Sequence, residues 1–162
     1  MDPRPKADPA MYPKLRDHAF RMPHPAVPDG NVTIALMDWR VSNGMCTVMA
    51  SADGSASLYL SSGGGFLGGG QAHSAIRDAA VAAVAVAQTQ IHYFALTEST
   101  GRPGPGDVYF YLVTNAGILH ASALDACLAD GSDRLLPLAA AMQNIVTQYR
   151  LKFSRPQNTT VQ

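Results

Sequence analysis

Charged side chains are scarce in this sequence. Asp, Glu, Lys and Arg supply 15% of its 162 residues, and the 12 basic and 12 acidic ones balance to a formal net charge of zero. Nucleic acids and anionic membranes attract proteins through an excess of basic residues, so we expect neither as a partner. A weakly charged surface also repels a second copy of the chain only weakly. This favours self-association, most simply as a homodimer.

Cysteine is also rare, and Cys46 and Cys127 are the only two. Two cysteines do not make a disulfide framework. Neither they nor the histidines fall at metal-ligand spacing, so we predict no metal site and no other cofactor. Both cysteines lie in apolar surroundings, and we expect them to be buried thiols in the core.

Long apolar runs are missing as well. Residues 79–97 carry no charge, but Gln88, Thr89, Gln90 and His92 interrupt them. A membrane-spanning helix needs roughly 20 apolar residues, which this stretch does not supply. The N-terminal residues lack the apolar stretch of a signal peptide. We therefore expect no membrane span and a cytoplasmic location.

The chain divides into three parts. Prolines recur through residues 1–30 and predict an extended arm, with one short helix over residues 12–22. Residues 31–154 have the composition of a single folded domain, and residues 155–162 are a polar tail.

The folded part begins with three predicted strands, at residues 32–41, 45–52 and 55–61. Tight turns at Asn43-Gly44 and Asp53-Gly54 join them into an antiparallel meander. A long helix follows over residues 72–93, then a hairpin of residues 107–114 and 117–123, and a last helix over residues 133–150. The order βββ-α-ββ-α predicts an α+β two-layer sandwich, with about five mainly antiparallel strands and the helices on one face.

The predicted helix over residues 72–93 is unusual because it is apolar on all sides. Ile76, Ala80 and Ala83 lie on one face, and Val81, Ala82 and Ala85 lie on the opposite one. A helix of this kind is buried on both sides. We therefore expect it to pack against the sheet and against a partner helix or subunit.

The strongest local feature is the glycine-rich segment between the meander and this helix. The candidate ligand-binding residues are its glycines and two polar residues that follow: Gly63, Gly64, Gly65, Gly68, Gly69, Gly70, His73 and Arg77. Glycines bring the backbone close to a ligand, and a helix N-terminus attracts anions. His73 and Arg77 are four residues apart and could reach the same anion. The alternatives are a sheet-to-helix joint and a solvated first turn.

Named nucleotide motifs do not fit this segment. The glycines satisfy G-x-G-x-x-G, but no parallel βαβ unit precedes the helix, and no acidic residue follows at positions 81–90. A P-loop would need Gly-Lys-Ser/Thr where Gln71 stands. The chain also lacks a Gly-x-Ser-x-Gly elbow and an acid–base pair, so we predict no catalytic residues. Asp38, inside an otherwise apolar strand, either points to solvent or marks a functional cleft.

Two resemblances accompany these patterns. The glycine-rich turn before an alanine-rich helix resembles the phosphate-binding half of the GHMP small-molecule kinases, although Gly-Gly-Gly-Gln-Ala lacks the serine pair of their motif. The predicted architecture is similar to the profilin-like group, including roadblock and longin modules. That resemblance implies a dimerising scaffold for regulators of small GTPases and identifies no site residues, because the element order here differs from theirs.

The sequence thus favours a non-enzymatic interaction or regulatory module that self-associates and binds a protein partner. The alternative is a small-molecule or phosphate-binding protein that uses the glycine-rich segment at a helix N-terminus.

Overall fold

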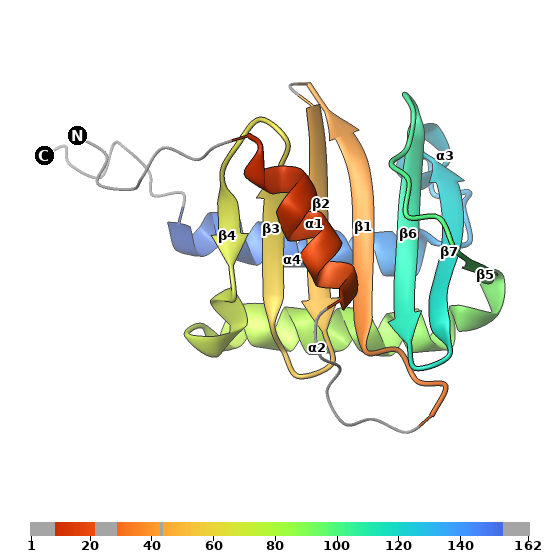
Figure 1. The fold of residues 1–162 in the computed structure, drawn as a ribbon, viewed down its shortest axis with the longest axis horizontal. Coiled ribbons are helices and arrows are strands. Elements are labelled where there is room, and N and C mark those ends of the chain that lie inside the picture. Colours follow the sequence, from red (N-terminus) through yellow and green to blue (C-terminus); the bar gives the residue numbers. More distant parts are fainter. Residues whose placement is uncertain (1–8, 22–28, 43, 154–162) are drawn as a thin grey trace, which may run out of the picture.

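The computed structural model describes residues 9–21, 29–42 and 44–153, which form an α+β fold (Figure 1). The predicted outer parts of the arm and the polar tail lie outside these residues. The strands are β1 (Ile34–Val41), β2 (Gly44–Ser51), β3 (Ala56–Leu60), β4 (Gly65–Leu67), β5 (Ala95–Thr97), β6 (Asp107–Thr114) and β7 (Gly117–Leu124). Helices are α1 (Met11–Arg21), α2 (Ser74–Thr89), α3 (Asp125–Ala129) and α4 (Leu136–Phe153), with 3-10 turns η1 (Gly69–Gln71) and η2 (Ile91–Tyr93).

The described strands form one sheet of seven in the order β4-β3-β2-β1-β6-β7-β5, and every neighbouring pair is antiparallel. The prediction of an antiparallel α+β sheet is confirmed, but the prediction of five strands in the order βββ-α-ββ-α is wrong. The two additional strands, β4 and β5, are three residues long and lie at the two edges. Strands this short carry too few residues to show a periodic pattern.

The helices do not all lie on one face of the sheet, as the sequence led us to expect. Figure 1 shows α2 and α4 behind the strands and α1 in front of them. Side chains of a strand alternate between the two faces, so each face has its own core. Ala35 and Met37 of β1 pack in the cluster with α2 and α4, whereas Ile34 and Leu36 pack in the cluster with α1. The fold therefore has three layers, with the sheet in the middle.

Helix α1 agrees closely with the predicted helix over residues 12–22. Its buried residues are Tyr12, Arg16, Ala19 and Phe20, which recur at helical spacing and face the sheet. An arginine in this set is unexpected, because a buried charge is unfavourable unless it is paired. Arg16 must therefore find an acidic partner on the sheet.

That partner is Asp38 of β1, whose exposed fraction is 0%. The Arg16 guanidinium donates to both carboxylate oxygens, with Nη2 2.6 Å and Nε 3.2 Å away. Nη1 also donates to the carbonyl oxygen of Thr100 at 2.6 Å, and Nη2 donates to that of Gly101 at 3.2 Å. Asp38 thus neither points to solvent nor lines a cleft, and both alternatives left open by the sequence are wrong.

A chain of hydroxyl groups completes the environment of this ion pair. Thr47 of β2 donates its one hydroxyl proton to Asp38, so the Tyr12 hydroxyl, 2.6 Å away, must donate to Thr47. Burial raises the pKa of Tyr12 and keeps this hydroxyl protonated. Four side chains from α1, β1 and β2 are therefore joined in one buried polar network.

The cysteines differ in environment. Cys46 of β2 is buried, and burial raises the pKa of its thiol to about 12. Cys127 of α3 is only half-buried, so the prediction of two core thiols holds for Cys46 alone. Both are free cysteines.

Replacing Arg16 tests the ion pair. Arg16→Met leaves the Asp38 carboxylate buried without a cation, and we expect the free energy of unfolding, measured by urea denaturation, to fall by about 3–5 kcal/mol. The double variant Arg16→Met/Asp38→Leu removes both charges and should recover a large part of this loss. A single variant that unfolds within about 1 kcal/mol of the parent would contradict the assignment.

Candidate functional site

The glycine-rich segment lies at one edge of the sheet and joins β3 to α2 (Figure 1). Gly63 and Gly64 form the turn after β3, Gly65 begins the edge strand β4, and Gly69 and Gly70 belong to η1. The segment thus contains a turn, a short strand and a helical turn instead of one continuous loop.

Several backbone N–H groups of the segment donate to other parts of the protein. Gly63 donates to the carbonyl of Leu60 at 3.0 Å. Gly68 donates to the Ser57 hydroxyl at 3.3 Å, and Gly69 donates to the Tyr149 hydroxyl at 2.9 Å. These amides are therefore unavailable to an anion unless the local structure changes. That the segment's glycines bind a ligand stays a prediction.

Close packing explains two of the glycines. A Cβ atom on Gly70 would lie 1.9 Å from the carbonyl oxygen of Gly54, and one on Gly69 would lie 2.6 Å from the Tyr149 ring. Neither distance is compatible with a side chain. Gly68 has a different requirement, because its φ of 66° lies in the left-handed region that favours glycine.

Tyr149 of α4 holds the glycine-rich segment against this helix by a hydrogen bond and a ring contact. Its hydroxyl accepts from Gly69 and donates to the carbonyl of Ala56 at 2.7 Å, so it connects η1 to β3. Its ring stacks on Phe66 of β4, with the ring centroids 5.0 Å apart. Burial raises the pKa of Tyr149, which keeps the hydroxyl proton in place for this bridge.

Sequence reasoning placed Tyr149 in the last helix but not at this site. The only signal was its apolar-face position at helical spacing, which a core residue shares. A side chain 80 residues away from Gly69 in the chain gives no local pattern that would connect the two.

His73 and Arg77 contact different neighbours. His73 is the N-cap of α2 in extended conformation, and its carbonyl accepts a hydrogen bond from the Arg77 N–H at 3.1 Å. The His73 ring packs edge-on against Phe153 at the end of α4, with the centroids 5.2 Å apart. The stem of Arg77 instead lies against Gly54 in the turn between β2 and β3, where a Cβ would approach Arg77 Cγ to 2.6 Å.

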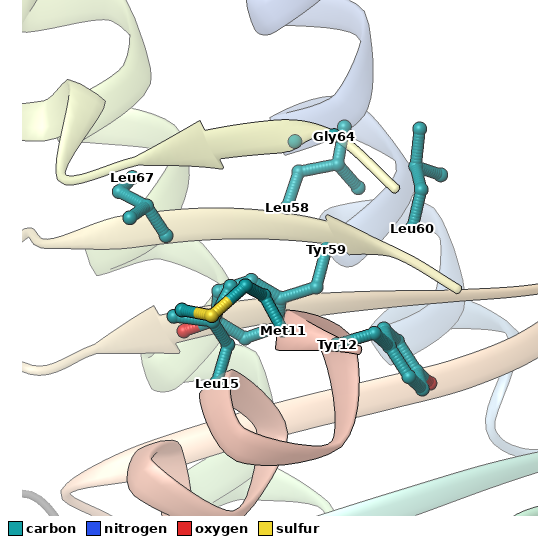
Figure 2. Close-up of a pocket in the computed structure, with 9 residues that line it drawn as sticks. Met11, Tyr12, Leu15, Leu58, Tyr59, Leu60, Gly64 and Leu67 are labelled. Carbon is teal, nitrogen blue, oxygen red and sulfur yellow. The ribbon is translucent and has the colours of Figure 1, made fainter. Parts of the chain in front are cut away.

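The glycine-rich segment also borders a cavity of about 220 Å³ beneath α1. Figure 2 shows the lining residues: Met11, Tyr12 and Leu15 from α1, Leu58, Tyr59 and Leu60 from β3, and Gly64, Gly65 and Leu67 from the glycine-rich segment. Gly65 is the ladder partner of Tyr59, and a Cβ atom on Gly65 would lie 2.1 Å from the carbonyl oxygen of Leu58. We call the cavity beneath α1 the α1 cavity.

The α1 cavity is apolar and uncharged. None of its lining residues is Asp, Glu, Lys, Arg or His. The hydroxyl of Tyr12 is engaged by Thr47, and burial raises the pKa of Tyr59, so both tyrosines stay neutral. Such walls suit an aliphatic or aromatic group and offer no cation to a phosphate.

Two other features, a metal-binding group and a membrane-spanning helix, are absent from the described part of the chain. No three His, Cys, Asp or Glu residues there are grouped so that they could hold a metal ion. No helix among those residues is both long and apolar enough to cross a membrane.

Comparison with protein-family models, curated proteins and solved structures gave no match for the chain. The resemblances to profilin-like modules and to GHMP kinases therefore rest on residue patterns and architecture alone.

A pair of glycine variants tests whether close packing explains the glycine-rich segment. Gly70→Ala places a methyl group against the Gly54 carbonyl and should lower the free energy of unfolding by about 1–3 kcal/mol. Gly104→Ala is the matched control, since a Cβ there meets nothing within 4 Å. It should change stability by less than about 1 kcal/mol. Equal losses in urea denaturation for the two variants would contradict the packing argument.

Proposed function

We propose that the protein is a non-enzymatic interaction module that self-associates, as a homodimer, through the outer face of α2 and α4. The observation that carries the proposal is a long uncharged stretch in each of these two helices, although Arg77, Asp78, Arg150 and Lys152 lie towards their ends. Residues 79–89 of α2 contain no Asp, Glu, Lys or Arg. The same is true of residues 135–149, which run from just before α4 through most of its length. We call the solvent-facing side of these two stretches the helical face.

Helix α2 is buried on one side only within a single chain. Ile76, Ala80 and Ala83 pack in the core, as expected. The opposite side was expected to be buried as well, but Ala82 and Ala85 are exposed, and the Val81 side chain is 44% exposed. Small apolar side chains allow another helix to approach closely, so a second copy of the chain would supply the missing cover.

Helix α4 extends this surface with uncharged residues. Its exposed positions include Ala140, Asn144 and Thr147. The central parts of protein interfaces are depleted in charged residues, because ionic groups lose hydration on burial. The helical face therefore has the composition of an interface core, with short polar side chains that can hydrogen-bond across it.

The buried titratable groups support a non-catalytic function. Asp38 and Arg16 neutralise each other in the interior, and Thr47 and Tyr12 complete their hydrogen bonds. Cys46 is a buried thiol whose raised pKa keeps it protonated and poorly nucleophilic. These groups stabilise the fold and are not placed to attack a substrate.

Charge introduced into the helical face should prevent self-association. Ala82→Glu/Ala85→Glu places two carboxylates at exposed helical positions, where glutamate is well tolerated by a helix. We expect the parent protein to sediment as a dimer at micromolar concentration and the double variant to sediment as a monomer with an unchanged far-ultraviolet circular dichroism spectrum. His18→Glu, at an exposed position of α1 on the opposite side of the sheet, is the control and should remain dimeric. A parent protein that is monomeric throughout this range would refute the proposal.

Small-molecule binding is the second candidate function, and the α1 cavity favours it. Gly64 and Gly65, two of the predicted ligand-binding residues, line this cavity. The chemistry differs from that expected of the segment, because the walls are apolar. An uncharged aliphatic or aromatic ligand fits these walls better than a phosphate does.

A neutral apolar probe separates the two ligand classes. N-phenyl-1-naphthylamine should fluoresce more strongly on entering the α1 cavity. Leu15→Gln should weaken its binding about five- to tenfold, which corresponds to roughly 1–1.4 kcal/mol of lost apolar contact. Lys14→Gln, at the adjacent exposed position of α1, should bind as the parent does. Thermal protection by inorganic phosphate, with no binding of the probe, would instead favour an anion site at the glycine-rich segment.

A further inference from the structure

A second cavity, of about 230 Å³, lies on the helical side of the sheet between α3, α4 and the strands β1 and β6. It is separate from the α1 cavity, because the two are lined by different residues and lie on opposite faces of the sheet. We call it the α3 cavity. It shares none of the residues predicted from the glycine-rich segment.

The α3 cavity has an apolar interior. Met37 of β1 and Val108 of β6 are buried and form its floor, and Leu128 and Leu136 contribute walls from α3 and from the start of α4. The single tryptophan of the chain, Trp39, also lines it. Trp39 is the ladder partner of Val108 and is half-buried, so one part of its indole is available to a bound molecule.

Two polar side chains stand at the exposed side of this cavity. Asp125 begins α3, and Gln143 comes from the middle of α4. The backbone N–H of Asp125 donates to the Gly106 carbonyl at 2.8 Å, which fixes the position of this residue. Asp125 is the charged residue among those lining the cavity, so the local charge is negative.

Neither polar side chain is engaged by the rest of the described chain. Among the residues that the structure describes, no Lys, Arg or His forms an ion pair with Asp125, and the Gln143 amide makes no hydrogen bond with its side chain. Both groups can therefore accept hydrogen bonds from a ligand. These two acceptors lie beside an aromatic and aliphatic interior. The cavity therefore suits a ligand that carries a cationic group on an apolar body.

We propose that the α3 cavity binds a small aryl-alkyl primary amine. Its ring packs against Trp39 and the apolar walls, and its ammonium donates to the Asp125 carboxylate and the Gln143 side-chain oxygen. Pockets for drug-sized molecules measure roughly 300–1,000 Å³, so a cavity of this size suits a single ring with a short arm. The proposal concerns a single chain, although the α3 cavity shares the exposed residues Ala140 and Gln143 with the helical face.

The charge requirement is tested with three ligands of nearly equal shape: 2-phenylethylamine, 2-phenylethanol and 3-phenylpropionate. Because Trp39 is the only tryptophan, its emission reports binding at this cavity directly, and titration calorimetry supplies a second readout. We expect saturable binding of the ammonium form, with the alcohol about three- to fivefold weaker and the carboxylate weaker still. An affinity ratio of about three to five between amine and alcohol is what a partly exposed ion pair contributes.

Two matched pairs of variants locate the ligand. Asp125→Asn should reduce the amine's affinity to that of the alcohol. Asp17 is an exposed aspartate of α1, and Asp17→Asn should leave the affinities for both ligands unchanged. Ala129→Phe fills the cavity from α3 and should weaken both ligands at least tenfold. Ala126→Phe is on the same helix but does not line the cavity, so it should leave both affinities unchanged.

Three results would overturn the proposal. The first is no saturable binding of the amine by either readout. The second is equal affinity for the amine and the alcohol in the parent protein. The third is an amine preference that survives Asp125→Asn, because the ammonium would then lie elsewhere.

Discussion

The buried ion pair between Arg16 and Asp38 is the interaction on which the three-layered fold depends. Asp38 lies in β1, the strand at the centre of the sheet, with no exposed surface. A carboxylate at this position is tolerated only if a cation and hydrogen-bond donors surround it. Helix α1 supplies the cation, and β2 supplies the Thr47 hydroxyl. The pair therefore requires α1 on this face, and α1 in turn covers apolar residues such as Ile34 and Leu36. One polar contact thus specifies where a whole layer sits.

The opposite face is organised by close packing instead of charge. Gly69 and Gly70 let η1 approach Tyr149 and the Gly54 carbonyl, and the Tyr149 hydroxyl then connects η1 to β3. This makes the glycine-rich segment a joint between the sheet and the helical layer. The same segment contributes Gly64 and Gly65 to the α1 cavity on its other side. A structural joint and a binding surface are therefore compatible in this protein, because they use different sides of one backbone.

Three candidate surfaces lie on this chain, and two of them, the helical face and the α3 cavity, share exposed residues of α4. The helical face is uncharged, whereas the α1 cavity is apolar and lies between α1 and the edge of the sheet. The α3 cavity differs from both, because it combines apolar walls with the carboxylate of Asp125.

The sequence by itself determined the antiparallel α+β class, the main strands and helices and the tight turns. These features follow from local signals such as the alternation in β6 and the helical spacing in α2. It also offered a sheet-to-helix joint as the alternative to a ligand site in the glycine-rich segment before α2. Tertiary structure alone decided that α1 covers the second face, that Asp38 pairs with Arg16, and that Tyr149 reaches Gly69. The partners in these contacts are 22 and 80 residues apart in the chain, so no local pattern links them. The edge strands β4 and β5 depend on pairing with β3 and β7, since three residues have too little preference of their own to specify a strand.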